Sequence, residues 1–97
     1  MTSPVDIAAV LATSALLPGP EGYDLAELMA TVEGHGWTCW VEPMASAADE
    51  RDRWRAMVFE AGKEAVVGRR RGYRGRGLTQ ADALASALAR MLARRRA

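Results

Sequence analysis

The sequence predicts an α+β fold in which two helices cover one face of a three-stranded antiparallel sheet, with an extra helix at the N-terminus. Three observations lead to this two-layer sandwich. The chain has 97 residues, the size of one small domain. Apolar residues recur at helical spacing near both ends. Between these regions lie runs rich in β-branched and aromatic residues, which are typical of strands. The predicted order of elements is α-α-β-β-β-α.

The N-terminal third predicts two helices. The first spans residues 4–17, with Ser3 as N-cap, Pro4 at the first position and Asp6 in the first turn. The proline- and glycine-rich residues 18–22 end it. The second helix begins near Asp24 and stops at Gly34 or Gly36. Its apolar stripe comprises Leu25, Leu28, Met29 and Val32.

The middle of the chain predicts three strands. The first runs from Trp37 to Glu42, with Trp37 and Trp40 on opposite faces because their spacing is odd. A polar connection over 44–53 leads to the second strand, Trp54 to Glu60. Residues 61–63 form a short hairpin loop, and the third strand runs from Glu64 to about Arg70.

The last quarter predicts one alanine-rich helix, which Thr79 caps and in which Asp82 completes a capping-box pattern. Its apolar stripe comprises Leu84, Leu88, Met91 and Leu92. The many alanines make the helix slim enough to lie close to a sheet. The chain therefore divides into an N-terminal helix with its linker, residues 1–22, and an α-β-β-β-α domain, residues 23–97.

The N-terminal helix is additional to the sandwich. It pads an edge of the domain, pairs with a second copy, or lies loosely outside. If it mediates self-association, the candidate interface residues are Ile7, Val10 and Leu11. Trp40 joins them, because an aromatic on an uncovered sheet face suits either a stacking platform or a protein interface.

Composition excludes several classes of protein. No stretch approaches the roughly 20 apolar residues of a membrane span, and the N-terminus lacks the pattern of a signal peptide. Cytoplasmic location is the default expectation. The single cysteine, Cys39, permits no internal disulfide, and the single histidine, His35, has no partners at metal-ligand spacing. We therefore expect no metal, no cofactor and no catalytic residues, and so a protein that is not an enzyme.

The charge is strongly segregated along the chain. Residues 1–62 carry ten acidic residues against three arginines, a balance of −7, whereas residues 63–97 carry ten basic residues against two acidic ones, a balance of +8. The positive half includes the stretch from residue 69 to residue 77, in which five arginines and three glycines surround one tyrosine. Arginine forks suit phosphate, and an aromatic ring can stack on a base. The candidate nucleic-acid contacts are Arg69, Arg70, Arg71, Tyr73, Arg74 and Arg76.

The segment from Gly75 through Gly77 and Thr79 into the alanines of the final helix resembles the double-stranded-RNA-binding domain over residues 24–93. The positions where that family carries RNA-contacting lysines hold Gln80, Ala81 and Leu84 here. The chain also resembles the phage ABA sandwich type of small α-β-β-β-α domain. That resemblance rests on Gly36-Trp37, on Trp54 with Val58-Phe59, and on Thr79 with Ala83-Leu84. It implies a bacterial or phage origin and no specific activity. The end of the chain is also similar to the Gly-x-Thr-x-x-x-Ala-Leu helix of HicB-like antitoxins.

Two functions follow from these patterns. The first is a small non-enzymatic nucleic-acid-binding module that contacts the DNA or RNA backbone through the arginine–glycine stretch. The alternative is a protein–protein interaction or assembly module, with homodimerisation as one form. A solvated loop that serves only solubility explains the same arginines, so the sequence leaves the choice open.

Overall fold

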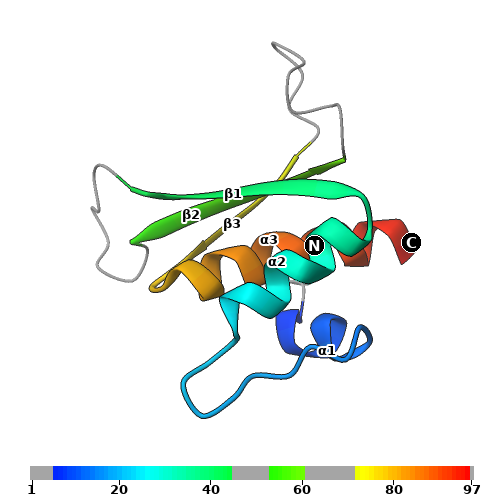
Figure 1. Cartoon of the computed structure of the whole chain (residues 1–97), viewed down its shortest axis with the longest axis horizontal. Coiled ribbons are helices and arrows are strands. Elements are labelled where there is room, and N and C mark those ends of the chain that lie inside the picture. Colours follow the sequence, from blue (N-terminus) through cyan, green and yellow to red (C-terminus); the bar gives the residue numbers. More distant parts are fainter. Residues whose placement is uncertain (1–5, 45–52, 61–71, 97) are drawn as a thin grey trace, which may run out of the picture.

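The computed structural model describes residues 6–44, 53–60 and 72–96. Within them the chain forms a sheet layer and a helix layer, as predicted (Figure 1). The elements follow in the order α1, α2, β1, β2, β3 and α3. The described helices include none that is both long enough and apolar enough to cross a membrane.

The sheet is antiparallel with the strand order β1-β2-β3. Strand β1 spans Trp37–Pro43 and β2 spans Trp54–Glu60, which confirms both predicted strands to within one residue. The register places Trp40 opposite Met57 and Glu42 opposite Arg55. Trp37, Cys39 and Val41 face the helices because they pack on the core, so Thr38, Trp40 and Glu42 lie on the opposite face.

The third strand differs from the prediction. The expected strand from Glu64 to Arg70 lies outside the described residues, as does the expected hairpin loop over 61–63. The strand that pairs with β2 is β3, Tyr73–Gly77, and it lies inside the stretch predicted to be a loop. Strand propensity disfavours this glycine-containing sequence, but its glycines allow a helix to pack directly on it, and tertiary packing overrides propensity.

Two helices, α2 (Leu25–Gly34) and α3 (Gln80–Arg96), cover one face of the sheet (Figure 1). Both begin at predicted caps. The Asp24 carboxylate accepts a hydrogen bond from the Ala26 backbone N–H at 2.8 Å, and the Thr79 hydroxyl accepts one from the Asp82 N–H at 3.1 Å. These bonds satisfy donors that lack partners within a helix.

Helix α1 spans Ile7–Ala12 and is shorter than the predicted residues 4–17. Its N-cap is Asp6, which was expected in the first turn, while Ser3 and Pro4 lie outside the described residues. After the helix, Ala15 adopts φ 61°, and the Leu16 N–H donates to the Leu11 carbonyl at 3.0 Å. This left-handed turn buries Leu16 and leaves Leu17 66% exposed. Because alanine rarely adopts this conformation, the residue types near Ala15 did not predict that α1 would end at Ala12.

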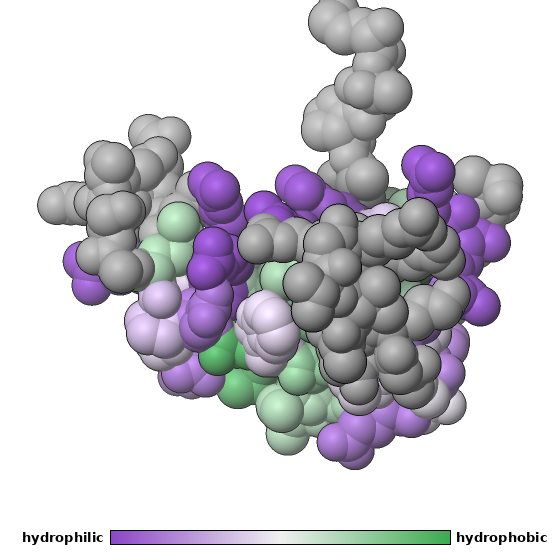
Figure 2. Space-filling view, turned by 90° about the horizontal axis from the view of Figure 1, so that it is seen from above, coloured by the Kyte–Doolittle hydropathy of each residue, from purple (hydrophilic) through white to green (hydrophobic). Residues whose placement is uncertain are grey.

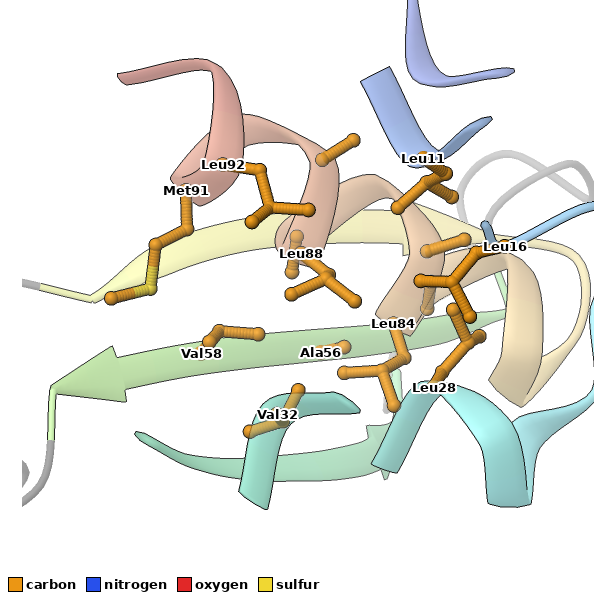
Figure 3. Close-up of a cluster of buried hydrophobic side chains, with 14 of the residues drawn as sticks. Leu11, Leu16, Leu28, Val32, Ala56, Val58, Leu84, Leu88, Met91 and Leu92 are labelled. Carbon is orange, nitrogen blue, oxygen red and sulfur yellow. The ribbon is translucent and has the colours of Figure 1, made fainter. Parts of the chain in front are cut away.

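The core lies between the helices and the sheet and also includes α1. Leu11 and Leu16 point toward the leucines of α2 and α3 (Figure 3). The largest fully buried side chains are Leu11, Leu28, Leu84, Leu88, Met91, Val32 and Val58. Helix α1 therefore packs against α3 instead of lying loosely outside. The division of the chain at residue 22 stays a prediction.

Candidate functional site

Strand β3 presents different residues on its two faces. Gly75 is buried beneath α3: a Cβ atom built on it would collide with the Ala83 carbonyl oxygen and the Ala87 nitrogen, and would lie 2.8 Å from Ser86 Cβ. Because successive strand residues point to opposite faces, Arg74 and Arg76 lie on the face away from the helices. Both are exposed. The glycines of this stretch thus allow α3 to pack closely on β3. Arg74 and Arg76 of the same stretch remain on the surface.

Strand β3 is also an edge of the sheet. The Met44 N–H donates to the Arg53 carbonyl at 3.0 Å, which shows that Arg53 directs its carbonyl toward β1. Backbone groups alternate along a strand, so those of Ala56 and Val58 point toward Gly75 and Tyr73 of β3. The backbone groups of Arg74 and Arg76 therefore point outward, along the outer edge of the sheet.

A groove of about 460 Å³ follows this edge, where β3 meets α3. We call it the arginine groove, and its lining comprises Arg74, Gly75, Arg76, Ser86 and Arg90. Arg90 comes from α3, so arginines from both layers line the same groove. Arg90 was not among the contacts predicted from the sequence. In the sequence, Arg90 is the charged residue between the apolar residues Ala89 and Met91 of the final helix. In the structure it is exposed, whereas both neighbours are buried.

The arginine groove has an unbalanced positive charge. Within residues 6–44, 53–60 and 72–96, none of its three arginines has an ion-pair or hydrogen-bond partner, and none of the described lining residues is acidic. An anion bound in the groove would balance part of this positive charge. Guanidinium groups are well shaped to receive phosphate or carboxylate oxygens.

Two other arginines have partners. Arg55 on β2 makes an ion pair with Glu42 on β1, in which its Nε lies 2.8 Å from the carboxylate oxygen. Arg95 near the end of α3 donates to Glu60 at 2.9 Å and lies 5.4 Å from the centre of the Trp37 ring. These contacts assign Arg55 and Arg95 to the stability of the fold and distinguish them from the arginines of the groove.

Tyr73 lies apart from the arginines with which it was grouped. It is partly buried and packs against the core on the helix-facing side of β3. The exposed aromatic residue on the same face as Arg74 and Arg76 is Trp40, which is 47% exposed, whereas Phe59 on that face is buried. In the register, Trp40, Met57 and Arg74 form one row across the three strands. The expectation that Trp37 and Trp40 take opposite faces is confirmed, since Trp37 is 7% exposed.

The remaining candidates are distributed as follows. Arg69, Arg70 and Arg71 lie outside the described residues. Leu11 is fully buried in the core, and Ile7 and Val10 are partly buried against it. The surface that α1 can offer to a second copy is therefore smaller than its apolar stripe suggested.

A second hollow, of about 660 Å³, lies at the start of α2 and contains acidic side chains. Glu21, Asp24 and Glu27 are among its lining residues, and Asp24 already serves as the helix cap. The hollow and the arginine groove are formed by opposite halves of the sequence. The separation of charge along the sequence therefore persists in the folded chain, where one hollow is lined by acidic residues and the other by arginines.

His35 lies just before β1 and Cys39 lies within it, and each has structural contacts. Burial, and secondarily the negative charge of Glu33, raises the pKa of the Cys39 thiol, which disfavours the nucleophilic thiolate. His35 stacks on Trp37 with 4.2 Å between ring centres. Among the described residues, no group of three or more histidine, cysteine or acidic side chains is arranged to hold a metal ion.

Comparisons of the chain with protein-family models, with curated proteins and with solved structures find no match. The resemblances to the double-stranded-RNA-binding domain and to the phage ABA sandwich stay predictions.

Proposed function

We propose that this protein is a small non-enzymatic nucleic-acid-binding module whose backbone contacts come from the arginine groove. The observation that supports the proposal is that Arg74, Arg76 and Arg90 line one groove and have no counter-charge from the described residues. Phosphate groups supply the missing negative charge, and each phosphate contact releases counterions from the nucleic acid. The outward backbone groups of β3 add hydrogen-bond donors to the same edge.

The arginine groove offers contacts to the nucleic-acid backbone and none that would distinguish one base sequence from another. Contacts between arginine and phosphate fix the position of a nucleic acid but carry no information about its bases. We therefore expect binding that depends strongly on salt and weakly on sequence. Arg69, Arg70 and Arg71 precede β3 in the chain and belong to the same proposal as additional phosphate contacts.

The test is fluorescence anisotropy with labelled DNA and RNA oligonucleotides, in single-stranded and duplex form, at about 50 and about 200 mM salt. The variant R74Q/R76Q/R90Q should bind more weakly and reduce the slope of log affinity against log salt by about 1 per arginine. A second variant, R69Q/R70Q/R71Q, measures the share of the preceding arginines.

The matched control is Arg95→Gln, which removes the same charge from an arginine that has partners. Compared with it, each single substitution in the groove should weaken binding more. The proposal fails if the unmodified protein binds none of the probes, or if Arg95→Gln weakens binding as much as Arg74→Gln. Light scattering on the same samples measures self-association, so assembly is detected independently.

A further inference from the structure

Trp40 is exposed on the sheet face that the helices leave uncovered. Its side chain is 47% exposed, although tryptophan is among the most costly residues to leave in water. Figure 2 views this face and shows hydrophobic and weakly polar surface beside strongly hydrophilic residues. The core of the fold does not require Trp40, since the core lies on the opposite side of β1.

The surroundings of Trp40 hold its ring in place. Phe59 on β2 contacts it edge-on, with 5.1 Å between ring centres and 62° between the ring planes. Phe59 and its face neighbour Met57 are both 5% exposed, and Gly72 packs against both side chains, so the Trp40 ring stands beside a covered part of this face. An aromatic ring that is held in this way loses little conformational entropy when a ligand stacks on it.

Trp40 also lies on the same surface as two arginines of the groove. Trp40, Met57 and Arg74 occupy one row across the sheet, and Arg76 lies two residues further along β3. Neighbouring strands are about 4.8 Å apart, so the Cα atoms of Trp40 and Arg74 lie roughly 10 Å apart. An extended ligand that passes over the covered Met57 between them can therefore contact the ring and the cations together.

This arrangement distinguishes between kinds of nucleic acid. In a duplex the bases are stacked inside and their faces are not accessible to a side chain on a flat sheet. In a single strand the bases can turn outward and stack on aromatic rings while the backbone follows a positive groove. Any base can stack, so the arrangement does not require a particular sequence.

We infer that the exposed residues on the sheet face turned away from the helices bind single-stranded nucleic acid, with a base stacked on Trp40 and neighbouring phosphates held by Arg74 and Arg76. The inference rests on the proposed function and deepens it by naming the class of ligand. Trp40 takes the role that the sequence analysis gave to Tyr73, which packs against the core instead.

The experiment measures affinity for unstructured single-stranded DNA and RNA oligonucleotides and for duplexes of the same length. The variants are Trp40→Ala and Trp40→Phe, with Leu17→Ala as the matched control because Leu17 is 66% exposed and follows α1. Trp40→Ala should lower affinity for single strands about tenfold or more and leave the salt dependence unchanged, because no charge is lost. Trp40→Phe should retain most of the affinity, and Leu17→Ala all of it.

The outcomes separate this inference from the proposed function. Loss of single-strand binding on Trp40→Ala, with thermal unfolding unchanged, supports both. If single strands and duplexes bind equally and Trp40→Ala binds like the unmodified protein, the stacking inference is overturned while nucleic-acid binding stands. If no probe binds, both are overturned. If light scattering shows that Trp40→Ala converts a dimer into a monomer, Trp40 belongs to a protein interface and the inference is again overturned.

Discussion

The two faces of strand β3 carry contrasting residues. On the helix side, Gly75 and Gly77 have no side chains, and α3 lies directly against the backbone. On the uncovered side, Arg74 and Arg76 extend long charged side chains toward solvent. The helix side tolerates almost no added atom, whereas the uncovered side carries charge that the described fold does not use. In the arginine–glycine stretch, the glycines therefore pack against α3, and the arginines form a candidate binding surface.

The largest expected effect comes from adding a methyl group on the packed side. We expect Gly75→Ala to destabilise the fold by about 2–3 kcal/mol, because the new Cβ would meet backbone atoms of α3 that cannot rotate away. Urea unfolding followed by circular dichroism measures this change. Gly34→Ala is the matched control, since no atom lies within 4 Å of its added Cβ, and it should be neutral or slightly stabilising. Equal stability of the two variants would contradict the close packing.

An intermediate effect is expected where an arginine has partners. Arg95→Gln removes the ion pair with Glu60 and the contact with the Trp37 ring. Both partners of the pair are substantially exposed, at 52% and 41%, so we expect a loss of about 1 kcal/mol or less. The melting temperature should fall slightly, and by less at high salt because salt screens exposed charges. A loss equal to that of Gly75→Ala would show that the contact is more buried than the structure indicates.

The smallest effect on stability is expected on the uncovered side. Arg76 lies directly opposite Arg55 in the register, and like charges in that position repel. Arg76→Gln should therefore change the free energy of unfolding by less than about 0.5 kcal/mol, in the stabilising direction if at all. Urea unfolding at low salt tests this. A clear destabilisation would mean that Arg76 supports the fold, and would weaken its assignment to a binding surface.

The sequence predicted most of the fold because most of its signals are local. Asp24 and Thr79 cap their helices as their residue types indicate, and the alternation from Trp37 to Glu42 placed the correct side chains on each face. The third strand could not be placed in this way, because the β-branched residues near Val66 gave a stronger local signal than the glycines of β3. The early end of α1 was missed for a related reason, since Ala15 carries no turn signal.

The candidate site was predicted in part. Arg74 and Arg76 are exposed on one surface, in agreement with their selection as contacts, but Tyr73 lies on the other side of the strand. A loop would have allowed all three to gather around one ligand, whereas a strand sends adjacent residues to opposite faces. Arg90 was not selected because the meeting of α3 with the edge of β3 is a long-range contact.

The sequence by itself determined the order of the elements, the apolar faces of α2 and α3 apart from Met29, which is 40% exposed, the two faces of β1 and the separation of charge along the chain. These properties depend on residue spacing and on caps within a few positions. The tertiary structure decided which residues form the third strand, where Arg90 lies and which aromatic accompanies the arginines. Those outcomes depend on the packing of α3 against Gly75 and Gly77, which joins segments that share no local signal.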